Sequence, residues 1–455
     1  MEIAIVIIFV LGYLAITLEH SLKIDKLIPA LLMMVLAWTT LSFGLDGFAT
    51  WFDSHTSKML EGFVGLGHED RLELLEKTLL HHFGKTSEIL IFLIGAMTIV
   101  EIIDHFDGFS TIKGFVKTNK KRTLLWIVCI LGFLLSSIID NLTATIVLIT
   151  ILRKLLPDAK DRMWYAGLII IAANAGGAWS PIGDVTTTML WMGKKVTAGK
   201  LMEYLVVPSV ICLAVPLVIA SFVPAFKGTF KAAITTEKEN KHNKLMFYLG
   251  LILIVFVPIF KTITHLPPYV GMMLSLVIIA TVAEILSNRK YNITNASIEL
   301  EENEAVVNHK SPTFKALSRI ELPSILFFLG ILMTVAALES LGLIFTFGQT
   351  VQAAIPNNVF IALLGVSSAV IDNVPIVAAS MGMYDMSVFP MDSHVWHFIA
   401  YAAGTGGSML IIGSAAGVVA MGMEKISFFW YLKNIAWLAL LGYLAGFIFM
   451  VLFHS

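Results

Sequence analysis

The chain has 455 residues, of which 57% are hydrophobic and only 14% are charged. Its mean hydropathy of +0.84 excludes a soluble globular protein, because a soluble domain of this composition would expose large apolar patches. The 31 basic and 32 acidic residues nearly balance, so the charge gives no reason to expect nucleic acid as a partner. We therefore expect an integral membrane protein surrounded by the lipid bilayer.

Apolar runs of membrane-spanning length recur along the whole chain. A spanning helix needs about 17 to 25 residues, and runs of this kind fit helices better than the strands of a barrel. The first run has no basic segment before it and no cleavage site after it, so we interpret it as a span and not as a removable signal peptide. The predicted spans are 3–18, 28–44, 88–103, 163–178, 203–224, 245–262, 267–286, 322–338, 395–412 and 428–453.

The loops between these runs carry charges that indicate their side of the membrane. Lys and Arg gather at 113–122, 153–162 and 227–244, and basic loops face the cytoplasm. The long segment 45–87 is mainly acidic and is expected outside. Within it, leucines between the acids of 53–87 predict an amphipathic helix on the membrane surface, or a docking face for a second protomer in a homodimer.

Residues 123–152 form an apolar stretch with Asp140 and Asn141 near its centre and basic clusters at both ends. A straight helix of this length would extend about 45 Å and would place one basic cluster outside. Two half-helices that enter from the cytoplasm and return avoid this conflict. The sequence therefore predicts a re-entrant hairpin with Asp140 near the membrane midplane.

A second hairpin is predicted at 357–383. Its tip, at 367–373, repeats the Ser-Ser and Ile-Asp-Asn of 136–141, and its flanks lack Lys and Arg, so it is expected to enter from outside. The two halves of the chain then have inverted topology, a recurring plan of secondary transporters. We expect repeats at 1–226 and 245–455, joined by a cytoplasmic linker at 227–244.

A further repeated pattern follows each hairpin. Residues 172–178 match 402–408, and an Ile-Gly pair follows each match in the same register. Small residues of this kind can simply pack helices closely. Two copies downstream of Asp-Asn hairpins favour helices that are interrupted where they line a site, at about 163–193 and 395–423.

These predictions bring together side chains that nearly all offer oxygen ligands. Oxygen ligands suit hard cations, and thiolate or imidazole would suit transition metals. No Lys or Arg lies within the motifs, which weakens the case for an anionic substrate. Asp184 could instead act only as a helix cap. The candidate site residues are Asp140, Asn141, Thr143, Asn174, Ser180, Asp184, Thr186, Thr187, Ser367, Asp372, Asn373, Thr405, Ser408 and Ser414.

Carboxylates in such a site could also bind protons, because desolvation raises the pKa of an Asp by up to about 3 to 5 units. A site that holds either a cation or protons supports antiport. The chain has no phosphate-binding G-x-x-x-x-G-K-[ST] loop and no H-E-x-x-H motif. We therefore expect no cofactor, no enzymatic activity and transport driven by ion gradients.

The motifs at 140–145, 174–177, 180–188, 404–408 and 412–417 make the chain similar to the NhaD-type sodium/proton antiporters of the ion transporter superfamily. The resemblance implies exchange of Na+ or Li+ for protons in a bacterial inner (plasma) membrane. Dicarboxylate carriers of that superfamily use Ser-Asn-Thr signatures at the hairpin tips, whereas this chain has Asp before each Asn. The site residues implied are Asp140, Asn141, Asn174, Asp184, Thr186, Thr187, Asp372 and Asn373.

Two alternatives remain open from the sequence. A carrier of the same fold could move another solute, such as arsenite or a carboxylate. An intramembrane aspartyl protease could use two aspartates as a dyad, although the aspartates at 140 and 372 are each followed by Asn, which suits ion coordination better. The sequence does not determine the ion selectivity, the proton stoichiometry or the pH optimum.

Overall fold

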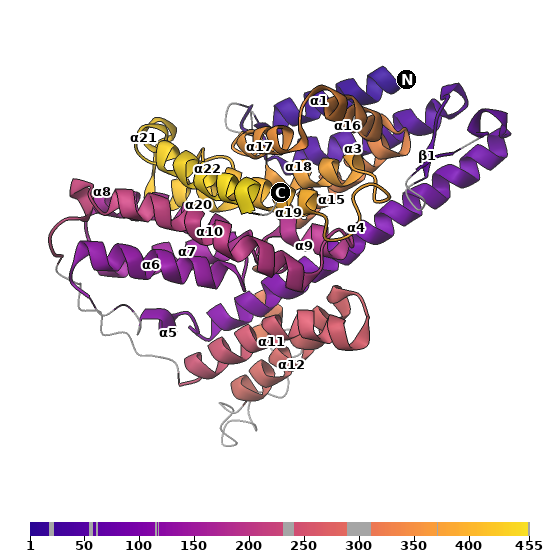
Figure 1. Cartoon of the computed structure of the whole chain (residues 1–455). Coiled ribbons are helices and arrows are strands. Elements are labelled where there is room, and N and C mark those ends of the chain that lie inside the picture. The colour runs from indigo at the N-terminus through magenta and orange to yellow at the C-terminus, as the bar shows by residue number, and fades with distance from the viewer. Residues whose placement is uncertain are drawn as a thin grey trace, which may run out of the picture.

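The computed structural model describes residues 1–17, 22–53, 58–60, 62–113, 116, 118–230, 241–288, 311–370 and 372–453. In this part of the chain almost every ordered element is a helix (Figure 1). Six helices, α4, α10, α11, α12, α15 and α22, are long and apolar enough to cross a membrane. The predicted linker 227–244 lies partly outside the described residues.

The first half of the chain contains the single long helix α4, a hairpin of two half-helices and a helix interrupted near its middle. Its helices are α1 (Glu2–Thr17), α3 (Leu27–Phe43), α4 (His68–His105), α5 (Ser110–Lys113), α6 (Lys121–Ser136), α7 (Asn141–Leu155), α8 (Ala159–Gly177), α9 (Val185–Met192) and α10 (Ala198–Ala220). Short elements are the strands β1 (Phe52–Asp53) and β2 (Lys58–Met59) and the 3-10 turns η1 (Leu45–Gly47), η2 (Phe63–Gly65) and η3 (Pro224–Phe226).

The second half repeats this order. Its helices are α11 (Asn243–Thr264), α12 (Pro268–Asn288), α14 (Pro312–Leu317), α15 (Leu322–Ser340), α16 (Leu343–Ala354), α17 (Asn357–Ser367), α18 (Asn373–Met383), α19 (His394–Gly406), α20 (Ala415–Glu424), α21 (Phe428–Asn434) and α22 (Ala436–Phe453). The helix pairs α6–α7 and α17–α18 occupy the predicted hairpins, and α8–α9 and α19–α20 occupy the predicted interrupted helices.

Helix α4 crosses the molecule diagonally and reaches the β1 strand at one end (Figure 1). Its 38 residues extend about 57 Å, which is longer than a bilayer core. The predicted amphipathic helix begins at His68 and is not a separate element, because it continues directly into the span. Arg71 fixes the preceding loop to this extension by donating to the carbonyls of Leu45, Val64 and Leu66.

Both hairpin turns are built around a capping aspartate. Asp140 precedes α7 and accepts the Thr143 N–H at 2.8 Å. Asp372 precedes α18 and accepts the Val374 N–H at 3.3 Å. Asp is a favoured N-cap residue because its side chain satisfies N–H groups that have no partner within the helix. The repeated Ile-Asp-Asn is thus the start signal of the second half-helix in each hairpin.

The hairpins lie against the interrupted helices in the same register. The Ser136 hydroxyl donates to the Ala173 carbonyl at 2.6 Å, and the Ser368 hydroxyl donates to the Ala403 carbonyl at 3.0 Å. Ala173 and Ala403 are themselves matched positions of the predicted repeat. The two halves therefore share a tertiary contact as well as a sequence pattern.

Glycines allow this close approach. A Cβ added to Gly176 would lie 2.2 Å from the Phe133 carbonyl oxygen, and a Cβ added to Gly406 would lie 2.0 Å from the Gly365 carbonyl oxygen. Close packing and interruption were alternative interpretations of the glycine pattern. The structure has both features, because α8 and α19 each pack closely through a glycine and end at or just after it.

The repeats exchange helices. Helix α3 of the first half packs on α15 of the second, and α12 of the second half packs on α4 of the first. The segments 26–34 and 265–273 share Leu, Pro, Met and Met in one register, so α3 and α12 are corresponding elements. The fold is therefore an all-α polytopic fold with two inverted-topology repeats, as the sequence predicts.

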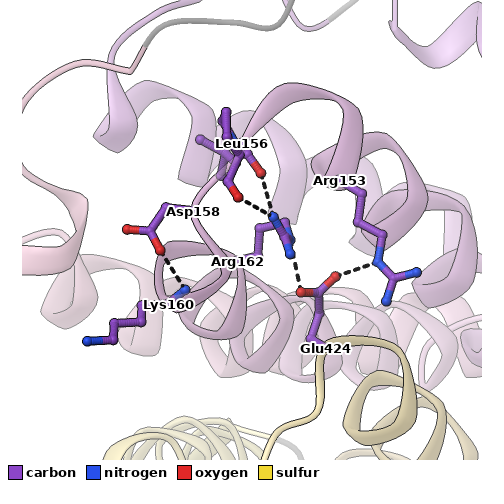
Figure 2. Close-up of polar contacts among 7 residues, drawn as sticks. Arg153, Leu156, Asp158, Lys160, Arg162 and Glu424 are labelled. Carbon is purple, nitrogen blue, oxygen red and sulfur yellow. Dashed lines mark hydrogen bonds and ion pairs between the residues drawn. The ribbon is translucent and has the colours of Figure 1, made fainter.

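A buried carboxylate connects the halves at the end that carries the basic loops (Figure 2). Glu424, at the end of α20, is 2% exposed and accepts from Arg153 Nε at 2.7 Å and from Arg162 Nε at 2.9 Å. Arg162 also donates to the Leu156 and Pro157 carbonyls. These contacts join α7 and α8 of the first half to α20 of the second.

Candidate functional site

A cavity of about 90 Å³ lies where the two hairpin turns and the first interrupted helix meet. Its walls combine apolar side chains from α4, α11, α12 and α15 with polar groups from the motifs. The cavity thus draws residues from both halves of the chain. Its polar lining residues are Lys26, Asp140, Asn141, Asp184, Thr188, Glu321, Ser324, Asp372 and Asn373.

Asp184 lies at the centre of this arrangement and is 4% exposed. Its Oδ1 accepts the Thr186 N–H at 3.2 Å, which caps α9. Its Oδ2 accepts from the side-chain amides of Asn141 at 3.4 Å and Asn373 at 3.2 Å. Capping alone therefore does not account for Asp184, because its second oxygen contacts both hairpin turns.

Asn174 connects the first hairpin to the second interrupted helix. Its Oδ1 accepts from Asn141 Nδ2 at 3.0 Å, and its Nδ2 donates to the hydroxyls of Ser408 at 2.9 Å and Ser414 at 3.0 Å. Asn174 is fully buried. Because such a buried amide must satisfy its polar atoms internally, this network fixes the relative positions of the elements around the cavity.

The two hairpin aspartates have different partners. Both oxygens of Asp140 are occupied by Thr143, whose N–H lies at 2.8 Å and whose hydroxyl lies at 2.7 Å. Asp372 instead pairs with Lys26, whose Nζ lies 3.2 Å from Oδ2. The two halves of the site are therefore similar in sequence but unequal in charge.

Several predicted residues shape the site without lining the cavity. The hydroxyls of Ser367 and Thr405 donate to carbonyls one turn back in their own helices. The Thr187 hydroxyl donates to the Ser180 carbonyl at 2.6 Å, which stabilises the break between α8 and α9. Thr186 contributes its backbone N–H to the carboxylate that caps α9.

Sequence reasoning missed two charged residues of the cavity, Lys26 and Glu321. Lys26 lies just before α3 and Glu321 just before α15, so both look like ordinary interfacial charges in the sequence. The repeat of 26–34 at 265–273 marks α3 and α12 as corresponding elements, but the packing of α3 on α15 of the other half is seen only in the structure. Only that exchange brings Lys26 to the hairpin of the other half.

In the described part of the chain no group of three or more His, Cys, Asp or Glu side chains is placed to hold a metal ion. A cluster of carboxylates around one divalent ion is therefore not present there. What the cavity does offer is single carboxylates beside residues with amide and hydroxyl groups, namely Asn141, Asn373, Thr188 and Ser324. Such mixed oxygen sets suit hard cations.

Comparisons with known proteins place the chain among transporters. A family model described as citrate transporter (CitMHS) matches residues 13–396. Sodium/proton antiporter 1 of Arabidopsis thaliana is 43% identical over 98% of this chain and 71% of its own length. Sodium/proton antiporter 2 of the same plant is 39% identical over 99% of each chain. The Na(+)/H(+) antiporter NhaD of Vibrio parahaemolyticus is 32% identical over 82% of this chain and 92% of its own.

A solved structure shares the fold. The YdaH transporter of Alcanivorax borkumensis superposes with a TM-score of 0.57 at 14% identity, over 93% of this chain and 98% of its own. These matches and the six spanning helices confirm a multi-pass membrane protein that is a transporter and not an enzyme. The bacterial antiporters among the relatives support the expected inner (plasma) membrane. The chain belongs to the family of the NhaD-type sodium/proton antiporters.

Proposed function

We propose that this protein exchanges Na+ or Li+ for protons across the plasma membrane, which would serve pH homeostasis and salt tolerance. The cation and the protons compete for the carboxylates of one cavity, formed by Asp140, Asp184 and Asp372. The names of the antiporter relatives support the exchange of Na+ for protons. The assignment of these residues, and of Asn141, Asn174 and Asn373 as ligands or positioning groups, is our own.

The observation that carries the proposal is the position of Asp184. It is a buried carboxylate whose Oδ2 receives amides from hairpins in both halves of the chain. A carboxylate inside a membrane protein is costly unless it is paired or functional. Among the described residues, the side-chain partners of Asp184 are amides and not a cation, so a bound Na+ or a proton could neutralise it.

The charge of the cavity argues against an anionic substrate. Among the described residues that line it, four carry carboxyl groups, namely Asp140, Asp184, Asp372 and Glu321, and only Lys26 is cationic. Lys26 is already paired with Asp372. A citrate-like carboxylate would thus enter a site of its own charge, although the family model that matches is described as citrate transporter.

The hydrogen bonds of the aspartates argue against the protease alternative. Two catalytic aspartates share one proton between adjacent carboxyl groups. Asp184 instead accepts hydrogen bonds from two amides, and Asp140 accepts two from Thr143. These contacts favour coordination of an ion.

The test is cation-dependent proton flux in liposomes that contain the purified protein and a pH-sensitive dye. We expect Na+ and Li+ to collapse a preset pH gradient, and citrate to have no effect. K+ tests the selectivity, which the sequence leaves open. The Asp184→Asn variant should lose the flux. Flux driven by citrate, or wild-type flux that does not depend on Na+ or Li+, would contradict the proposal.

The same proposal includes the division of the chain and its assembly. We propose inverted repeats at 1–226 and 245–455, with a cytoplasmic linker at 227–244 and a homodimer as the functional unit. The shared contacts of Ser136 with Ala173 and of Ser368 with Ala403 support the repeats. Crosslinking in native membranes, followed by mass determination, tests the dimer.

A further inference from the structure

Lys26 brings a positive charge into a cavity whose other charged lining residues, among those described, all carry carboxyl groups. Its Nζ lies 3.2 Å from Oδ2 of Asp372, and the two side chains are only 28% and 17% exposed. The ammonium also lies 4.5 Å from the centre of the Phe327 ring, a cation–π contact that helps to hold it there. Lys26 thus occupies the place beside Asp372 that a bound cation would need.

The sequence of the second hairpin leaves Asp372 open to this contact. In the first hairpin, Thr143 donates its N–H and its hydroxyl to the two oxygens of Asp140. The corresponding residue of the second hairpin is Pro375, which has neither group. Asp372 therefore accepts only one N–H of α18, through Oδ1 at 3.3 Å, and its Oδ2 is left for Lys26.

The repeated fold by itself does not require a cationic side chain at the position of Lys26. In the exchanged arrangement, His265 before α12 corresponds to Lys26 before α3. His265 is exposed and is not among the described residues that line the cavity. The Lys26–Asp372 pair is therefore a feature of one half only, which points to a role in the site and not in the scaffold.

We propose that Lys26 is an internal competitor of the transported cation at Asp372. This inference rests on the proposed function, because it concerns the same cation site. Oδ2 of Asp372 cannot hold the ammonium and a metal ion together, since both are positive and need the same oxygen. Binding of Na+ or Li+ displaces Lys26 towards Glu321, whose side chain lines the same cavity. Lys26 thereby sets the cation concentration at which the cation site of the carrier becomes occupied.

The test compares Lys26→Gln, Lys26→Arg and the wild type in the liposome assay, at one fixed pH, with KM and maximal rate determined separately for Na+ and Li+. We expect Lys26→Gln to lower the apparent KM about tenfold, which is the effect of removing a competing attraction of about 1.4 kcal/mol. Lys26→Arg keeps the charge and should stay near the wild-type KM. Lys23→Gln, in the exposed loop before α3, is the matched control and should leave both parameters unchanged.

A second variant keeps the inference testable if Lys26→Gln does not fold. Pro375→Thr offers Asp372 the same donors that Asp140 has, and it should also lower KM by weakening the Lys26 contact. A purely structural role would reduce the amount of folded protein and the maximal rate without lowering KM. An unchanged or raised KM in folded Lys26→Gln, with normal wild-type flux, overturns the role of Lys26 alone. Absence of wild-type flux would instead overturn the proposed function.

Discussion

At the scale of single residues, the aspartates of the site each have a local and a proposed ionic role. Asp140, Asp184 and Asp372 all cap a helix that begins directly after them. Capping needs an acceptor oxygen but no charge, whereas exchange of a cation for protons needs an ionisable carboxyl group. These two roles can be separated by substitution, because Asn is about as good an N-cap as Asp.

Asp184→Asn should therefore abolish exchange while keeping the cap of α9. We expect the flux to fall at least about a hundredfold, the effect of losing about 2.7 kcal/mol or more of cation binding. The thermal midpoint in detergent should fall less than in Asp184→Ala, because the new amide keeps the capping oxygen although its NH2 faces the amides of Asn141 and Asn373. Asp184→Ala is the control, because it also removes the cap and should cost about 1 kcal/mol of stability. Substantial flux in Asp184→Asn would show that this carboxylate is not the exchange site.

The residue scale also shows how much of the site the sequence could predict. Asp140, Asn141 and Asp184 were found because each stands in an apolar run with a local motif around it. Lys26 and Glu321 could not be found in this way, since they precede spans, where charges are common. Their positions depend on helix exchange between the repeats, which is a tertiary property with no local signal.

At the scale of elements, each interrupted helix approaches its hairpin closely through glycines, at Gly176 and Gly183 in the first half and at Gly406 and Gly413 in the second. The interruption itself was predictable from the matching segments 172–178 and 402–408 and the Ile-Gly pair after each. The extent of α4 was not predictable, because leucines between charged residues fit a surface helix and the outer part of a long helix equally well. The structure has the long helix, and the buried Arg71 near its start donates to three carbonyls of the preceding loop.

Gly176→Ala should separate the first hairpin from α8. The new Cβ would lie 2.2 Å from a backbone oxygen of Phe133, and backbone cannot move away as a flexible side chain can. We expect a loss of at least about 1 to 3 kcal/mol, the usual cost of overpacking, together with a large loss of flux. Thermal unfolding in detergent measures the first effect.

The matched control is Gly84→Ala, in the outer part of α4, where nothing lies within 4 Å of the added Cβ. This variant should be neutral or up to about 1 kcal/mol more stable, because Ala favours helix over Gly. Equal melting temperatures for Gly176→Ala and the wild type would show that the hairpin does not need this close approach.

The contacts of Glu424 with two arginines join α20 to α7 and α8. Because this carboxylate is 2% exposed and accepts from two arginines, Glu424→Ala should remove both charge-assisted hydrogen bonds and cost about 1.5 to 3 kcal/mol. Glu203→Ala is the control, since its pair with Lys200 is 63% and 48% exposed and should contribute at most about 1 kcal/mol. Melting curves of the two variants in detergent measure these losses of stability. Similar losses in both variants would mean that Glu424 does not join α20 to α7 and α8.

At the scale of the whole molecule, the two repeats form one unit. Helix α3 packs on α15 of the other half, and α12 packs on α4 of the other half. The cavity is lined by Asp184 from one half and Asp372 from the other. The loop charges predicted opposite orientations for the repeats, but they carry no information on which helices pair across them. The sequence therefore predicted the number and type of elements better than their partners.

This exchange of helices predicts how the protein behaves when it is divided. Cutting the chain within the polar sequence between Phe230 and Lys241 breaks neither α10 nor α11. Produced together, the two fragments should associate and exchange Na+ for protons, because every helix finds its partner. Produced alone, each fragment should aggregate or be degraded, since α4 would lack α12 and α15 would lack α3. Copurification through a tag on one fragment, followed by the liposome assay, measures both outcomes. A first fragment that is stable and active alone would show that the exchanged packing is not needed for the site.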